Sequence, residues 1–219
     1  MSEFPAVQVS APSRSLQHCG LDYAGPIVVR TSTGRGIASR KVYIALFVCL
    51  ATRAIHLELV SDYSTRVFLN AYVRFCSRRG LPQSIYSDNG TNFVGANREL
   101  AAAYRAALRD PAFQTASDSV AWHFLLPSAP HFGGIWEPEV KSVKHHLRRV
   151  IGSHILTFEE LLTILCKVEA CLNSRPIARL SDNLDDYEPL TSDHFLIGAA
   201  ITSAPEPSLL VLNENRLSR

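Results

Sequence analysis

Long apolar runs are missing from this sequence of 219 residues, although 47% of it is hydrophobic. Residues 43–50 form one of its longest apolar stretches, and a membrane-spanning helix needs about 20 such residues. The N-terminus also lacks the basic and then apolar pattern of a signal peptide. We therefore expect a soluble intracellular protein that has no membrane partner.

Paired cysteines are missing as well. The five cysteines form an odd set, no two of them stand in a C-x-x-C spacing, and most lie in apolar runs. This pattern argues against a disulfide framework or a zinc finger and predicts buried free thiols. His145 and His146 are adjacent, so on a helix they point in different directions and do not form the usual i, i+4 metal pair.

Charge is also scarce, since 19% of residues are charged and the net charge is +2, which does not single out a nucleic-acid binder. The distribution of charge is more informative. Residues 141–149 contain four basic residues and no acid, whereas residues 182–193 contain five acids and no Lys or Arg. This pattern indicates that one face of the protein meets phosphate and another does not.

Hydrophobic periodicity predicts the order of strands and helices that follows a flexible N-terminal segment at residues 1–15. Strands are expected at residues 18–29, 41–50, 53–60, 84–87 and 120–125. Helices are expected at residues 64–80, 93–109, 135–152 and 157–174, and Ser64 and Thr157 provide caps. Residues 127–134 hold two prolines and two glycines, which predicts a mobile loop. The order predicts an α/β fold, a mixed sheet flanked by helices.

Three acidic residues occupy positions from which they could converge at one edge of the sheet. Asp22 is the only acid in an apolar strand, Asp88 follows the end of another strand, and Glu137 lies in the first turn of a helix. Carboxylates bind Mg²⁺, and a pair of such ions supports phosphoryl transfer to DNA. Each acid also has a structural explanation, as a turn residue, a turn cap or a favourable charge at a helix N-terminus. The residues alone leave both interpretations open.

The segments around these acids carry a resemblance to a known family. They are Gly20-Leu-Asp-Tyr-Ala-Gly-Pro26, Tyr86-Ser-Asp-Asn-Gly-Thr-Asn-Phe93 and Ala129-Pro-His-Phe-Gly-Gly-Ile-Trp-Glu137. In them the chain resembles the catalytic cores of the retroviral integrase superfamily, and most closely those of Pao/BEL-type LTR retrotransposons. The resemblance covers about residues 16–200 and implies an RNase H-like fold, with a five-stranded mixed sheet flanked by helices.

The resemblance implies a polynucleotidyl transferase, a nucleotidyltransferase and endonuclease that processes the 3′ ends of retroelement DNA and joins them to target DNA. It also implies that Asp22, Asp88 and Glu137 bind two Mg²⁺ or Mn²⁺ ions. The interval between Asp88 and Glu137 is longer than in the retroviral pattern, and an insertion around residues 109–119 would account for the difference. Glu137 is preferred to Glu139 because it fits the Gly-x-x-Glu register that begins at Gly134.

DNA-binding residues are expected on the helix that begins near Glu137. Lys141, Lys144 and Arg148 follow Glu137 at i+4, i+7 and i+11 and so share its face. The other face is an apolar stripe of Trp136, Val140, Val143, Leu147, Val150 and Ile151. Cations beside a scissile phosphate neutralise backbone charge, although an ordinary solvated basic face has the same pattern.

Two loop residues and one helix end are weaker candidates. Asn92 and His131 are expected in loops beside Asp88 and Glu137, where they could contact DNA, but a loop Asn is often only a turn former. Helix 64–80 ends with Arg74, Arg78 and Arg79. The helix dipole favours positive charge there, so no function is assigned to these arginines.

The resemblance further implies homo-oligomers that bind retroelement DNA ends and target DNA. The apolar helix at residues 158–172 could supply an oligomer contact, and it could equally pack within its own domain. The expected place of action is the nucleus, after a cytoplasmic particle or polyprotein stage, and residues 201–219 are interpreted as a truncated lead-in to a C-terminal domain. Two alternatives stay open, an RNase H-like nuclease and an inactive or domesticated DNA-binding or dimerisation module.

Overall fold

The computed structural model describes residues 14–31, 38–88, 90–107, 120–124, 134, 136–179 and 189–201. Its central element is a five-stranded mixed sheet with the strand order β3-β2-β1-β4-β5. The strands are β1 (His18–Arg30), β2 (Ser39–Cys49), β3 (Ile55–Val60), β4 (Ser84–Ser87) and β5 (Ala121–Phe124). The first three form an antiparallel meander, and β4 and β5 add to β1 in parallel, as the α/β prediction requires.

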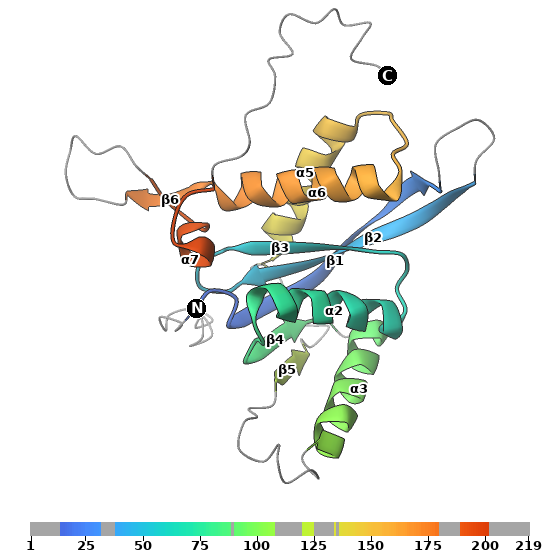
Figure 1. The fold of residues 1–219 in the computed structure, drawn as a ribbon, viewed down its shortest axis with the longest axis vertical. Coiled ribbons are helices and arrows are strands. Elements are labelled where there is room, and N and C mark those ends of the chain that lie inside the picture. Colours follow the sequence, from blue (N-terminus) through green and yellow to red (C-terminus); the bar gives the residue numbers. More distant parts are fainter. Residues whose placement is uncertain are drawn as a thin grey trace, which may run out of the picture.

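Helices cover both faces of this sheet, and Figure 1 shows the two layers on opposite sides of the strands. One layer holds α2 (Thr65–Arg79) and α3 (Thr91–Ala107). The other layer holds α5 (Glu137–Ile151) and α6 (Phe158–Asn173). The predicted fold class is confirmed, since a mixed sheet lies between helices and every predicted strand and helix is present with ends shifted by a few residues at most.

Side chains that alternate along the strands fill two separate cores. In β1, Leu21 belongs to the core beneath α2 and α3, whereas Ala24 belongs to the core beneath α5 and α6. In β2, Phe47 faces the first core and Leu46 the second. This alternation is the expected consequence of the period of two in a strand. It also decides which side chains of β1 and β4 face α5.

Two predicted caps are present with their hydrogen bonds. The Ser64 side chain accepts from the Val67 backbone N at the start of α2. At the start of α6, Thr157 and Glu160 form the reciprocal capping box, with distances of 3.2 and 2.7 Å. These local bonds satisfy backbone N–H groups that have no partner within the helix.

The segment after α6 contains structure that the sequence did not predict. A two-stranded sheet pairs β6 (Pro176–Arg179) with β7 (Pro189–Thr191), and the short helix α7 (His194–Ile197) follows. Before this segment, at the end of α6, the Asn173 side chain contacts the main sheet. It accepts from Ile55 N and donates to Ile55 O, at 2.8 and 3.0 Å. The end of α6 is therefore tied to an edge strand by a buried amide.

The expectation of buried thiols is correct only for part of the set. Cys19 and Cys49 are buried and Cys76 is half-buried, but Cys166 and Cys171 are exposed. The two exposed thiols lie on α6, which packs into the core through Leu161, Leu165, Val168 and Leu172 and turns its other side outward. That internal packing accounts for the apolar face of this helix. None of the described helices is long and apolar enough to cross a membrane.

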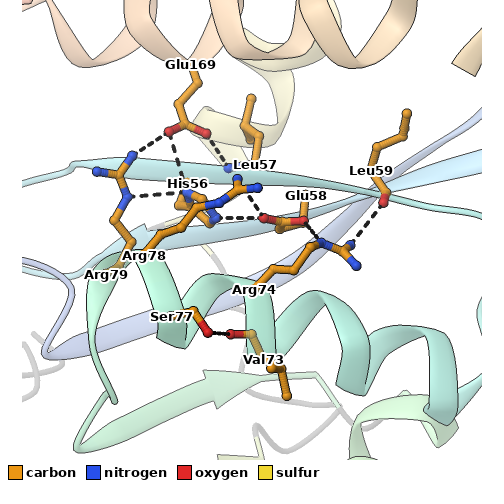
Figure 2. A network of polar contacts seen from close by, with 10 residues as sticks. All are labelled: His56, Leu57, Glu58, Leu59, Val73, Arg74, Ser77, Arg78, Arg79 and Glu169. Carbon is orange, nitrogen blue, oxygen red and sulfur yellow. Dashed lines mark hydrogen bonds and ion pairs between the residues drawn. The ribbon is translucent and has the colours of Figure 1, made fainter. Parts of the chain in front are cut away.

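A polar network lies along the edge strand β3, between α2 and α6, and is drawn in Figure 2. We call the side chains of His56, Glu58, Glu169, Arg74, Arg78 and Arg79 the β3 network. Glu58 accepts from Arg74 and Arg78 at 2.5 and 3.2 Å, and Glu169 accepts from Arg79 at 2.7 Å. The arginines at the end of α2 thus hold specific ion pairs, which the dipole argument alone did not predict.

Candidate active site

Asp22 and Asp88 are brought together by the pairing of β1 with β4. The two strands are parallel and Leu21 is aligned with Ser87, so each acid follows directly after an aligned pair. Residues two positions earlier show the direction of both side chains. Gly20 lies against Trp136 at the start of α5, and Tyr86 packs on the core beneath α5 and α6. By the alternation of side chains, both acids emerge on the face that carries α5.

Glu137 is the first residue of α5 and is exposed. The charge of Glu137 contributes to the pKa of Asp22, which is raised above its ordinary value. Burial is the main cause and the charges of Asp88 and Glu137 add to it, whereas a hydrogen bond from the Tyr23 backbone and the charge of Lys144 oppose it. Asp88, Glu137 and Lys144 therefore lie near enough for their charges to act on the carboxyl group of Asp22.

The described residues stop short of a closed metal site. Among them, no three His, Cys, Asp or Glu side chains are arranged so that they could hold one metal ion. The donor chemistry nevertheless fits Mg²⁺ or Mn²⁺, because all three candidate groups are carboxylates and these ions prefer oxygen ligands. The structure brings Asp22, Asp88 and Glu137 to one face and leaves them as an open set.

Asp88 is held in place by the turn that follows β4. Its Oδ1 accepts from the Gly90 backbone N at 3.0 Å, which is the turn-capping role expected of an Asp at this position. Ser87 fixes the backbone of the same residue, since its hydroxyl donates to the Asp88 carbonyl and accepts from Trp122 Nε1, at 3.0 and 2.9 Å. Asp88 is exposed, so turn capping leaves its carboxylate open to solvent.

Glu139 has a different role, which supports the choice of Glu137 for the site. Its side chain is buried and accepts from Arg175 at 2.6 Å. Arg175 follows α6, so this ion pair ties the first turn of α5 to the end of the next helix. A carboxylate neutralised in this way is poorly suited to bind a cation.

The predicted basic face of α5 is present. Lys141 and Arg148 are exposed and Lys144 is half-buried, while Val143 and Leu147 are buried on the opposite side. The predicted apolar stripe is wrong at Val150, which is 59% exposed. The buried part of α5 ends at Leu147, and in the last turn only Ile151 still packs on the core.

The two loop candidates have different outcomes. Asn92 was placed in a loop, but α3 begins at Thr91, so Asn92 lies in its first turn and only 8% of it is exposed. Its side chain lies beside the hydroxyl of Tyr23, whose pKa is raised by burial and lowered in part by Asn92. A buried helix residue has little surface to offer DNA, and the DNA contact of Asn92 stays a prediction. His131 lies outside the described residues.

Tyr63 is a neighbour of the acids that sequence reasoning missed. Its ring packs on Tyr43 and Tyr23, with centroid distances of 4.0 and 4.8 Å. Its pKa is raised by burial, by Tyr43 and by the charges of Asp22 and Asp88. The available signal was an aromatic residue directly before the α2 cap. Its proximity to the acids depends on contacts between distant parts of the chain.

Comparison with known proteins supports the fold and leaves the family undecided. No protein-family model matches the sequence, and no curated protein matches it. Among solved structures, the magnesium complex of the HTLV-2 integrase catalytic core matches in its trimeric form with a TM-score of 0.52 and 14% identity, over 85% of this chain and 99% of that one. Its dimeric form gives 0.51 and 13%, over 84% and 97%.

A larger assembly gives the same result. A chain of the simian T-cell lymphotropic virus intasome, solved with the PP2A regulatory subunit B56 gamma, matches with a TM-score of 0.52 and 13% identity. The match covers 91% of this chain and 60% of that one. The chain thus shares the RNase H-like fold of these integrase catalytic cores, and the predicted fold is confirmed.

Proposed function

We propose that this chain is the integrase catalytic core of a Pao/BEL-type LTR retrotransposon. In this proposal it is a polynucleotidyl transferase that processes the 3′ ends of the element's DNA and joins them to target DNA in the nucleus. The observation that supports the proposal is the alignment of Leu21 with Ser87, because Asp22 and Asp88 are the next residues along the two strands. The charge of Glu137 contributes to the raised pKa of Asp22, which supports Glu137 as the third acid of the proposed site.

The residues of the site then take separate roles. Asp22, Asp88 and Glu137 would hold two Mg²⁺ or Mn²⁺ ions, which stabilise negative charge on the attacking and leaving oxygens of a phosphodiester. Lys144 lies close enough to act on Asp22 and is suited to the phosphate nearest the reaction. Lys141 and Arg148 extend the same positive face along α5. Such contacts hold DNA without reading its bases.

Homo-oligomers are part of the proposal. The HTLV-2 core is described in a dimeric and a trimeric form, and this chain shares its fold. The apolar residues of α6 are used within the domain, so an oligomer contact on this helix would have to use its outward side.

The test is a strand-transfer assay with oligonucleotides that carry the ends of the element, in Mg²⁺ and in Mn²⁺. We expect joining by the wild type and a loss of at least roughly 100-fold in Asp22→Asn, Asp88→Asn and Glu137→Gln, because metal ligation contributes several kcal/mol to such reactions. Glu159→Gln is the control, since it changes an exposed acid on α6, away from the first turn of α5. It should keep its activity at temperatures where it is folded.

A second candidate is an inactive or domesticated module that binds DNA or dimerises. The open arrangement of the three acids within the described ranges favours it. A module of this kind would bind DNA without a divalent cation and would join no ends. Cleavage of an RNA–DNA hybrid without strand transfer would instead identify an RNase H-like nuclease. Retained strand transfer in all three acid variants would refute the proposed site.

A further inference from the structure

Trp136 connects the two elements that carry Asp22 and Glu137. It directly precedes Glu137, only 4% of it is exposed, and its carbonyl accepts from Val140 N in the first turn of α5. Its ring lies on Gly20, which is two residues before Asp22 on the same face of β1. One indole therefore fills the space between the backbone that carries Asp22 and the backbone that carries Glu137.

Gly20 allows this close approach. A Cβ atom built on Gly20 would overlap Cε3 of Trp136 and would lie 3.0 and 3.1 Å from Cδ2 and Cζ3. The backbone of Gly20 is not in the left-handed region, so its conformation does not call for glycine. The glycine is needed because the ring sits on the strand, as glycines in strands often permit close approach. Ring thickness then sets the distance between α5 and β1.

Within the part of the chain that the structure describes, the start of α5 lacks the side-chain cap found at α2 and α6. Ser64 and Thr157 fix the first turns of those helices with side-chain hydrogen bonds. At α5 the cap position is Trp136 itself, and it makes no side-chain cap hydrogen bond. Packing of the indole on Gly20, together with the ion pair of Glu139 and Arg175, holds this turn against the rest of the domain.

We propose that Trp136, seated on Gly20, is a positioning residue that fixes Glu137 beside Asp22 and thereby sets the divalent-cation affinity of the site. The inference rests on the proposed function, because it assumes that these acids bind a cation. A metal site is sensitive to small displacements of its ligands, and residues that orient ligands typically contribute about 10–100-fold to metal affinity. Trp136 acts through its neighbour and touches no reacting atom.

The experiment measures Mn²⁺ affinity of the full chain by electron paramagnetic resonance, alongside strand transfer. Gly20→Ala forces the ring off the strand, and Trp136→Leu removes it. We expect each to weaken Mn²⁺ binding by about tenfold or more, as for other residues that orient metal ligands. In the Trp136→Leu background the added Gly20→Ala should cost much less, because the ring that it displaces is gone. This lack of additivity separates positioning from two independent losses of stability.

Val143→Ala is the matched control. Val143 is buried on the same helix and in the same core, so its truncation lowers stability without moving the first turn. Its thermal midpoint should fall while its Mn²⁺ affinity stays within about twofold of the wild type, because Val143 lies about two helical turns beyond Trp136. If Gly20→Ala does not fold, Trp136→Leu and Trp136→Phe decide the question, with Phe expected to retain more of the affinity.

The outcomes separate the two proposals. Wild-type Mn²⁺ binding that depends on Asp22, combined with unchanged affinity in Gly20→Ala and Trp136→Leu, overturns the positioning role and leaves the proposed function standing. A wild-type chain that binds no Mn²⁺ overturns both. Weakened binding in these variants but not in Val143→Ala supports both.

Discussion

Two groups of carboxylates in this molecule have opposite electrostatic settings. In the β3 network, burial raises the pKa of Glu58 and of Glu169, but hydrogen bonds from His56 and the arginines outweigh burial, so both pKa values are lowered. At the junction of β1 and β4 the pKa of Asp22 is raised by burial and by two neighbouring acids, with Lys144 as the opposing cation. The carboxylates of the first group are stabilised by ion pairs with arginines, whereas the charged form of Asp22 is disfavoured by burial and by its acidic neighbours.

This difference separates a structural ion-pair network from a candidate binding site. Glu58 and Glu169 join an edge strand to the two helices beside it, and their charges are already balanced. The carboxyl group of Asp22 is buried near two further acids and is opposed by Lys144, an arrangement that suits a cation from solution. Perturbed carboxyl groups of this kind are enriched at functional sites. Four experiments sharpen the contrast.

The largest effect on stability is expected from Glu58→Gln. The substitution leaves buried His56 and two arginines without their carboxylate. We expect the free energy of unfolding to fall by about 2–3 kcal/mol, the usual range for hydrogen bonds to charged groups, as measured by urea denaturation. Exposed Glu99→Gln is the control and should stay within about 0.5 kcal/mol of the wild type. An equal effect of both substitutions would show that the network is not structural.

The pH dependence of stability gives a second test. Burial lowers the pKa of His56, but hydrogen bonds to Glu169 and Glu58 outweigh it, so the pKa lies above its usual 6.5. The stabilisation from protonated His56 is complete below pH 6.5 and is lost as the pH rises through the raised pKa. Glu58 and Glu169, whose pKa values are lowered, affect stability at acidic pH. Their stabilisation is present above pH 4.5 and is lost as the pH falls through the lowered pKa values.

The wild type should therefore lose thermal stability by a few degrees as the pH rises from neutral into the alkaline range. His56→Gln should lack this slope, while exposed His145→Gln should keep it. Thermal unfolding followed by circular dichroism between pH 5 and pH 9, roughly the range in which a histidine with a raised pKa titrates, measures all three. Parallel profiles for all three proteins would contradict the assignment.

Asp22→Asn should stabilise the fold, whereas Glu58→Gln should destabilise it. Because the pKa of Asp22 is raised in the folded state, its charged form reduces stability as the pH rises above its usual 3.8. Removing that charge should raise the thermal midpoint at neutral pH when EDTA is present. Saturating Mg²⁺ should raise the midpoint of the wild type and have less effect on the variant. A lower midpoint for Asp22→Asn would show that the acid stabilises the fold.

The smallest effect is expected from Trp122→Phe. The substitution keeps an aromatic ring and removes the hydrogen bond from Nε1 to the Ser87 hydroxyl. We expect a loss of about 1 kcal/mol, the usual contribution of a neutral hydrogen bond. Mn²⁺ affinity should fall slightly, because the Ser87 hydroxyl that Trp122 holds also bonds to the Asp88 carbonyl. Isothermal titration calorimetry measures this change. Unchanged stability would show that this bond contributes little to the end of β4.

Local sequence signals were sufficient for most of the fold. Ser64 and the pair Thr157 and Glu160 lie next to the helices that they cap, and strand alternation is visible in any short window of residues. The three acids were candidates by position, and the resemblance of the segments around them to integrase cores selected them. In the structure Asp22 and Asp88 follow an aligned pair of strand residues, and the roles of the three acids stay a prediction.

What the sequence did not predict depends on contacts between distant residues. Asn173 bonds with Ile55 across 118 positions, and Arg79 pairs with Glu169 across 90. No local sequence pattern predicts such pairs. The start of α3 at Thr91 was not predicted, because the Asn and Gly before it are typical of turns. In the structure the helix includes Asn92.

The central claim is that Asp22, Asp88 and Glu137 bind a divalent cation and that the β3 network does not. A Mn²⁺ titration of the wild type, the three single variants Asp22→Asn, Asp88→Asn and Glu137→Gln, and the comparison variant Glu169→Gln tests it most directly. The account predicts that each of the three weakens binding by about tenfold or more, while Glu169→Gln binds as the wild type does. Equal Mn²⁺ affinity in all five proteins would contradict it.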